Sequence, residues 1–253
     1  MPADAKRRHP WEVERAQFFR ARVASYLRPG VRILDVGAGD GYLSAHILSG
    51  LQAGETVVCF DACYSDDHLK RFSGAAPVGL SFTRERPETV FDLVLLLDVL
   101  EHISDDRGFL AGVVRDLLLP GGVLLASAPA HPSLYTRHDA ILGHCRRYRP
   151  AEFEALLQEV GLQIDIAGGL FHGLLPMRVG QKLGELLRGV RARPLVSDAP
   201  ENADTALTRW QAGPWVSGAV LGLLRLDNGL SRICAQLGIR LPGLSVWALA
   251  RKR

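Results

Sequence analysis

Short apolar runs alternate with amphipathic stretches along most of this chain. Strands buried on both faces of a sheet have this composition, rich in Ile, Leu and Val. Six runs fit it, at residues 33–36, 55–60, 91–97, 119–126, 162–167 and 244–250. The pattern therefore predicts several buried strands.

Helical periodicity fills much of the space between these runs. Residues 11–27 carry apolar side chains at helical spacing, and residues 42–48 directly follow the first run. Residues 151–160 follow Pro150, begin with an acidic turn and end at Gly161, as helix caps do. We expect three helices there, the first beside a ligand site, and a loose polar segment at residues 1–10.

The interval between the last two predicted strands is 76 residues long, from Gly168 to Gly243. Hairpin loops have roughly 2–5 residues, so this interval is an insertion. Residues 171–188 and 215–237 predict two apolar helices with interspersed basic residues, and residues 191–204 between them are rich in proline, alanine and acid. The insertion is interpreted as a lid or an acceptor-binding element. A peripheral contact with a membrane is the alternative, because basic amphipathic helices bind membrane surfaces.

The most specific local feature is the segment ILDVGAGDGYL at residues 33–43. Glycines at alternate positions let the backbone approach a ligand closely, and the following helix directs its N-terminal amides at that ligand. A dinucleotide fingerprint has Gly or Ala at its sixth position, where this chain has Tyr42. An oxidoreductase that uses nicotinamide is therefore the weaker alternative.

The same segment resembles the E/D-x-G-x-G-x-G motif of class I S-adenosylmethionine (SAM) dependent methyltransferases. Three later segments resemble the family in the same order: the strand that ends in Asp61, the FDLV and LEH segment at residues 91–102, and the LPGG turn at residues 119–122. The chain is thus similar to this family over residues 33–128.

The resemblance implies a fold and a cofactor site. The expected fold is α/β and Rossmann-like, a mostly parallel sheet with helices on both faces, an antiparallel last strand and the helical insertion before it. Residues 1–167 plus 244–253 would form the SAM-binding domain and residues 168–243 the insertion. The family would bind SAM, and release S-adenosylhomocysteine, at Asp35, Gly37, Ala38, Gly39, Gly41, Asp61, Ala62 and Asp98.

The composition of the chain limits which classes of binding partner we expect. The 253 residues carry a net charge of +3 with no domain-scale basic stripe, so we expect no nucleic acid partner. The four cysteines form no C-x-x-C pair and no secretory signal is evident, which favours a cytoplasmic protein. No uninterrupted apolar stretch reaches the ~18 residues of a spanning helix, so membrane contact would be peripheral, at the inner face.

Candidate catalytic groups lie after the fifth predicted strand. SAM is already a strong electrophile, so the protein must align the acceptor, exclude water and, for a hydroxyl or amine, remove a proton. His138 or His144 would be that base, with Asp139 orienting the ring. Arg146, Arg147 and Arg149 would bind an anionic group of the acceptor or pair with Glu152 and Glu154.

A metal site is an alternative that we weigh against the sequence. Asp98, Glu101 and His102 share one face if a helix starts early, and some O-methyltransferases hold magnesium on a Glu-x-x-Glu-His run with a later histidine, here His138 or His144. The first acid here is the shorter Asp98, and metal-free relatives share the LEH segment. We therefore expect no metal.

These observations predict methyl transfer from SAM to a small, hydrophobic, lipid-like or secondary-metabolite acceptor. The insertion suits a compact apolar molecule. The acceptor atom stays open among O, N and C, and the oligomeric state is undetermined. A non-catalytic SAM sensor or subunit would carry the same motifs and is the alternative.

Overall fold

A seven-stranded sheet forms the centre of the protein, with strand order β3-β2-β1-β4-β5-β7-β6. The computed structural model describes residues 8–51, 55–190 and 212–253. All neighbouring strands are parallel except β7, which is antiparallel to both β5 and β6. The strands are β1 (Ile33–Val36), β2 (Val57–Phe60), β3 (Leu80–Thr83), β4 (Phe91–Leu97), β5 (Leu118–Pro129), β6 (Leu162–Leu170) and β7 (Ser245–Lys252).

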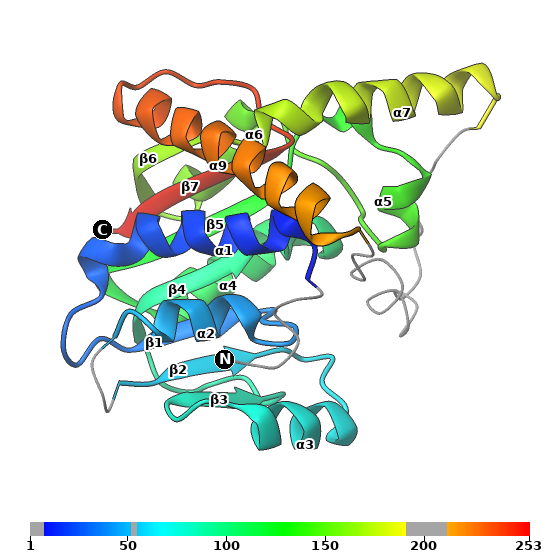
Figure 1. Cartoon of the computed structure of the whole chain (residues 1–253). Coiled ribbons are helices and arrows are strands. Elements are labelled where there is room, and N and C mark those ends of the chain that lie inside the picture. The colour runs from blue at the N-terminus through cyan, green and yellow to red at the C-terminus, as the bar shows by residue number, and fades with distance from the viewer. Residues whose placement is uncertain (1–7, 52–54, 191–211) are drawn as a thin grey trace.

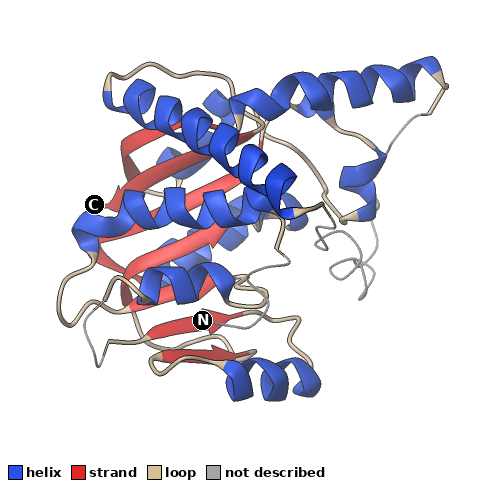
Figure 2. Cartoon of the chain, in the orientation of Figure 1, coloured by secondary structure: helices blue, strands red, loops and turns tan. Residues whose placement is uncertain are grey.

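Helices cover both faces of this sheet (Figures 1 and 2). One face carries α1 (Pro10–Val23), α2 (Tyr42–Leu48) and α9 (Pro214–Gln236), and the other carries α4 (Asp106–Leu117) and α6 (Pro150–Glu159). Helix α3 (Asp66–Ala75) packs beside β3 at the sheet edge. The predicted fold class, with its antiparallel last strand and helical insertion, is confirmed.

Alternation along the strands divides the core into two layers. Leu93 and Leu95 of β4 pack with Phe19 of α1, whereas Val94 and Leu96 pack with the α4 layer. Successive side chains of a strand point to opposite faces, so a fully apolar strand such as β4 stabilises both layers at once. This explains the unbroken apolar runs in the sequence.

Several predicted boundaries were wrong by a few residues. Helix α1 ends at Val23, and residues 24–26 form a 3₁₀ turn. Strand β6 continues to Leu170, because Gly168 and Gly169 still pair with β7. The LPGG segment lies within β5 as an irregularity in its pairing with β4.

The insertion between β6 and β7 contains two long helices among its described residues. Helix α7 (Leu175–Leu187) extends away from the sheet, whereas α9 lies across α1 (Figure 1). Between the two, residues 191–204, which the sequence marked as proline- and acid-rich, lie outside the described residues, as does most of the segment 1–10.

Candidate functional site

The glycine turn follows β1 and has the backbone conformation that its sequence requires. Gly37, Gly39 and Gly41 all have positive φ, at 71°, 54° and 72°. A Cβ on Gly37 would lie 2.5 Å from Cγ2 of Val99, and one on Gly41 would lie 2.6 Å from the Phe82 ring. Glycine is therefore needed at Gly37 and Gly41 both for conformation and for space, and at Gly39 for conformation alone.

Asp35 is buried at the base of this turn. Its carboxylate accepts a 2.6 Å hydrogen bond from the hydroxyl of Ser44 in α2. Burial raises the pKa of Asp35 to about 6, although the Ser44 bond opposes the shift. The turn thus contains a carboxylate that changes charge near neutral pH.

Asp61 lies at the end of β2 and faces the same turn. Its carboxylate accepts hydrogen bonds from the backbone N–H of Gly39, at 3.4 Å, and of Cys63, at 2.9 Å. Ala62 is exposed beside it, and Tyr64 donates a 2.5 Å bond to the carbonyl of Gly39. The predicted ribose acid and the glycine turn are therefore adjacent.

Asp98 follows β4 in a strained conformation, with φ of 58°. Its carboxylate accepts a 2.9 Å bond from the Ser127 hydroxyl at the end of β5 and pairs with the Arg15 guanidinium of α1, also at 2.9 Å. Strain of this kind in a non-glycine residue often marks a binding site. The structure thus gathers the predicted SAM residues at the C-terminal ends of β1, β2 and β4, where ligands bind in open α/β sheets.

Helix α1 supplies Arg15 and the segment before it supplies Arg8, two arginines that were not predicted from the sequence. Besides Arg15 on Asp98, Arg8 pairs with Asp40 and lies 4.0 Å above the centre of the Tyr42 ring. Only the expectation that this helix lies beside the cofactor site hinted at them. The two guanidiniums place positive charge over the crevice, where the carboxylate of a methionine group would pair with it.

The predicted acceptor side contains a buried ionic cluster around Asp139. This residue lies in α5 (Arg137–Ile141), is fully buried and accepts a 3.1 Å hydrogen bond from Nδ1 of His144. Arg147 and Arg178 pair with the same carboxylate at 2.7 and 3.1 Å. Burial alone would raise the pKa of Asp139, but the bonds from His144 and Arg147 lower it below its ordinary value.

His144 is also in contact with the 3₁₀ turn Leu100–His102, which follows β4. Its ring centre lies 4.8 Å from that of His102, nearly perpendicular to it. Burial and the neighbouring His144 lower the pKa of His102 to about 4, although the charges of Asp98 and Asp61 oppose the shift. The histidine pair is therefore within electrostatic range of the SAM carboxylates.

His138 differs from His144 in its surroundings. It is half-buried on α5, and burial together with the charge of Arg178 lowers the pKa of His138. Asp139 was expected to orient the ring of one of these two histidines, and its carboxylate is hydrogen-bonded to His144. The structure thus favours His144 over His138 as the oriented histidine.

A metal would find three ligands at this place. Carboxylate or ring atoms of Glu101, His102 and His144 lie within 4.8 Å of one another. Glu101 is fully buried with both oxygens unpartnered, and burial, then the charge of Asp98, raise the pKa of Glu101 well above its usual value. Asp98, the first acid of the predicted run, is bonded elsewhere, so the set fits a divalent ion with His144 rather than His138 as the later ligand.

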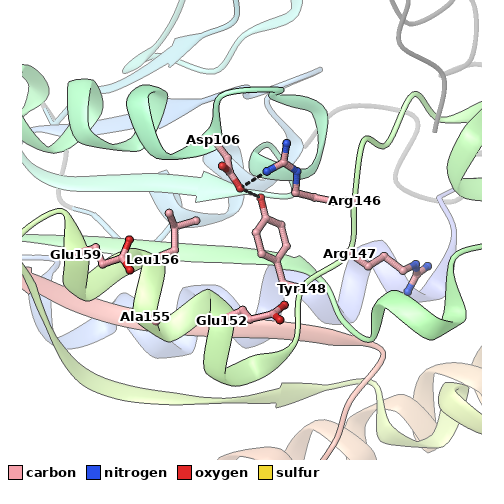
Figure 3. Close-up of a pocket in the computed structure, with 8 residues that line it drawn as sticks. All are labelled: Asp106, Arg146, Arg147, Tyr148, Glu152, Ala155, Leu156 and Glu159. Carbon is pink, nitrogen blue, oxygen red and sulfur yellow. Dashed lines mark hydrogen bonds and ion pairs between the residues drawn. The ribbon is translucent and has the colours of Figure 1, made fainter.

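The three arginines at residues 146–149 have partners within the chain. Arg149 pairs with Glu152 as the sequence suggested, Arg146 pairs with Asp106 at 2.8 Å, and Arg147 is buried on Asp139. Figure 3 shows Arg146 and Tyr148 meeting at Asp106 on the wall of an open hollow of about 550 Å³. None of the SAM residues lines this hollow, so it is not the predicted cofactor site.

A methyltransferase-domain family matches residues 6–165 of the chain. A protein of Mycolicibacterium smegmatis named "Probable S-adenosylmethionine-dependent methyltransferase" is 28% identical, over 83% of this chain and 85% of its own length. The ubiquinone biosynthesis O-methyltransferase of Paramagnetospirillum magneticum is 29% identical, over 60% of this chain and 69% of its length.

Solved structures agree on the fold. A SAM-dependent methyltransferase from Mesorhizobium loti has a TM-score of 0.53 at 16% identity, covering 91% of this chain and 96% of that one. A 4+2 cyclase has a TM-score of 0.52 at 17% identity, covering 94% and 80%. A fold shared with a cyclase does not by itself assign chemistry, so function must be argued from the site.

Proposed function

We propose a function from the premise that the chain belongs to the class I SAM-dependent methyltransferase family, whose domain covers residues 6–165. The protein is thus a SAM-dependent methyltransferase, and the oxidoreductase and sensor alternatives are set aside. The proposal concerns the acceptor and the base: a small, apolar or lipid-like molecule that carries a hydroxyl or amine, deprotonated by His144. The observation that carries it is the buried Asp139–His144 pair beside His102.

Each residue of this pair has a role in the proposal. Asp139 accepts a hydrogen bond from the Nδ1–H of His144, which leaves Nε2 as the atom that would take a proton from the acceptor. Because Arg147 and Arg178 keep Asp139 ionised, its negative charge stabilises the imidazolium that forms. The deprotonated oxygen or nitrogen of the acceptor would then bond to the methyl carbon of SAM as the bond from that carbon to the sulfonium breaks, and S-adenosylhomocysteine would leave.

The SAM residues bind and orient the donor in this proposal. Gly37–Gly41 would let the methionine part approach the backbone, and Asp61 would accept the ribose hydroxyls. Asp98 and Arg15 would border the charged end of the methionine part. Holding donor and acceptor in line supplies most of the catalysis that methyl transfer needs.

Two observations support an apolar acceptor. The insertion adds exposed apolar helices next to the His144 cluster, since Arg178 of α7 reaches Asp139. A relative is named ubiquinone biosynthesis O-methyltransferase, so its name states methylation of oxygen in the biosynthesis of ubiquinone. An acceptor that is lipid-like and carries a hydroxyl group is consistent with both observations.

The first experiment incubates the protein with methyl-labelled SAM and a bacterial cell extract, then measures label in organic, aqueous and macromolecular fractions. We expect label in the organic fraction, and none with Asp61→Ala, which cannot hold the ribose. Label confined to the aqueous or macromolecular fraction would refute the apolar acceptor.

The second experiment tests the base with the acceptor so found. His144→Gln should lower kcat by roughly 10²–10⁴ while SAM affinity stays unchanged. His138→Gln is the matched control on the neighbouring helix and should retain most of the activity. Equal losses in both variants, or a loss only in His138→Gln, would exclude His144 as the base.

A metal-assisted variant is the second candidate, favoured by the unpartnered carboxyl of Glu101 beside His102 and His144. A bound divalent ion would supply Lewis acidity toward an acceptor oxygen. Calorimetric titration of the chelator-treated protein with Mn²⁺ or Zn²⁺ tests it, with Glu101→Gln as the control. The sequence predicts activity without a metal. In that case, treatment with a chelator should leave kcat unchanged.

A further inference from the structure

Helix α9 carries an apolar stripe on its solvent side. Six apolar residues on this side and at the end of the helix are 48–75% exposed, and from Leu223 onward they recur every three or four positions. We call them the outer stripe: Val216, Leu223, Leu226, Leu230, Ile233 and Leu237. The buried side of the same helix includes the polar residues Asn228 and Ser231. Beside the apolar contacts of Leu224 and Ala235 with the core, α9 thus carries a second set of large apolar side chains on its solvent side, where an ordinary surface helix is polar.

Helix α7 repeats this arrangement. Its polar side faces the protein, where Arg178 pairs with Asp139 and Lys182 donates to the carbonyl of Tyr135 at 2.5 Å. Its solvent side carries exposed apolar residues, and the helix extends away from the sheet (Figure 1). These residues are Met177, Val179, Leu183, Leu186 and Leu187.

The exposed apolar residues are concentrated in the insertion. Of the 15 large apolar side chains that are exposed in the described part of the chain, 13 lie between residues 177 and 239. Trp215, at the start of α9, is 91% exposed. Scattered apolar residues need no explanation, but a concentration of this size marks an interaction surface.

The charge of this surface helps to decide between a second copy of the chain and an anionic surface as its binding partner. Residues 168–190 and 212–243 contain six basic and two acidic residues, a net charge of +4. Three of the basic residues, Arg178, Arg225 and Arg240, pair with carboxylates of other elements. The exposed basic residues Arg188, at the end of α7, and Arg232 of α9 add positive charge beside the apolar residues. Two copies of this surface would repel each other, whereas an anionic surface would attract it. Apolar stripes with Trp and interspersed Arg and Lys are the features of helices that lie in a membrane interface.

We propose that α7 and α9 dock this protein on an anionic lipid bilayer, in the plane of the membrane. No helix in residues 8–51, 55–190 or 212–253 is long and apolar enough to span a bilayer. This inference rests on the proposed function, because docking on a bilayer would bring a lipid-like acceptor to the enzyme.

The polar contacts of both helices connect this surface to the site. Arg178 of α7 bonds Asp139, the partner of the proposed base. Arg225 of α9 pairs with Glu14 of α1 at 2.8 Å, next to Arg15 on Asp98. A membrane on the outer faces would therefore lie one helix away from both the acceptor and the SAM residues.

The test is co-sedimentation of the full chain with phosphatidylcholine vesicles that contain or lack phosphatidylglycerol. We expect binding to the anionic vesicles that weakens with salt, and weaker binding to neutral ones. The double variant Leu223→Glu/Leu230→Glu should reduce the partition constant by about tenfold or more, since each buried leucine contributes on that scale.

The matched control is Val78→Glu, which makes the same kind of change at a 97% exposed apolar residue between α3 and β3. It should bind vesicles like the unchanged protein. Circular dichroism and SAM binding check that both variants fold.

Three outcomes would overturn the docking surface. They are no vesicle binding, equal loss in both variants, or a dimer that the double variant converts to monomer without any vesicle binding. Methyl transfer to an acceptor dissolved in detergent separates the two proposals: activity there, without vesicle binding, removes only the docking surface.

Discussion

Gly37 shows how closely single residues define the SAM turn. Alanine at this position would adopt φ of 71°, at about 1–2 kcal/mol, and its Cβ would collide with Val99. We predict that Gly37→Ala lowers the melting temperature and weakens SAM binding at least tenfold. Calorimetry measures both quantities.

Adding Val99→Ala to this variant removes the colliding methyl groups but leaves the backbone strain. Part of the lost stability and affinity should return. If the double variant is no better than Gly37→Ala, the collision with Val99 is not the cause of the loss.

Asp35 gives the cofactor site a pH dependence. Its pKa of about 6 means that it is protonated below that pH, when it no longer attracts the cationic methionine part of SAM. We predict that SAM affinity is constant above pH 7 and falls about tenfold per pH unit below 6. Titration of SAM at several pH values measures this, and Asp35→Asn should remove the dependence at lower overall affinity.

The same residue influences the stability of the free protein in the opposite direction. A carboxyl whose folded pKa is raised contributes its stabilisation below the unfolded pKa of 3.8 and loses it as pH rises through about 6. Asp35→Asn should therefore stabilise the SAM-free protein relative to the parent above pH 6. A pH series of urea unfolding curves tests the sign.

At the level of single residues, the sequence predicted what is local. The glycine turn, Asp35 and Asp61 could be identified because strand, turn and helix follow one another directly. The ion pair of Arg15 with Asp98 and the hydrogen bond from Ser127 to Asp98 could not be predicted, because these contacts join residues that are far apart in the chain. The choice of His144 over His138 likewise depended on how the chain after α5 turns back and places the His144 ring against Asp139.

The elements themselves were predictable where their periodicity is unambiguous. Strand β6 was assigned too short, because Gly168 and Gly169 are typical of a turn. They remain in the strand since Trp247 of β7 lies across them and donates a hydrogen bond to the carbonyl of Gly169. Cross-strand packing of this kind is not visible in the local sequence.

Arg178 links helix α7 to helix α5. It is buried and pairs with Asp139, and breaking a buried charge pair costs about 3–5 kcal/mol when one partner is left alone. Asp139 keeps Arg147 and His144, so we predict a smaller loss for Arg178→Met, about 1–3 kcal/mol, and faster amide exchange in α7. Hydrogen exchange with mass spectrometry measures it.

Arg188→Met is the matched control at the exposed end of the same helix. It should leave exchange in α7 at the parent rate. If both variants loosen α7 equally, the contact with Asp139 does not fix the helix.

At the scale of the whole molecule, the order of the motifs predicted the sheet and its cofactor edge. How the insertion joins the core could not be predicted, because apolar helices of a lid and of a core look alike in sequence. Leu224 and Ala235 of α9 belong to the same core layer as Phe18 of α1 and Trp247 of β7. The division into residues 1–167 plus 244–253 and an insertion of 168–243 stays a prediction about domains.

That shared core layer predicts cooperative unfolding. If α9 contributes to the core, calorimetry should show one transition that includes the insertion, since separating α9 would expose Phe18 and Trp247. SAM at 100 times its Kd should shift the whole transition by the equivalent of about 2.7 kcal/mol, and Asp61→Ala should abolish the shift. Two transitions, of which SAM moves only one, would instead mean that the insertion folds as a separate unit. The packing of α9 against α1 and β6 argues for the single transition, because separating the helix would break the core layer that Leu224 and Ala235 share with Trp247 of the neighbouring strand β7.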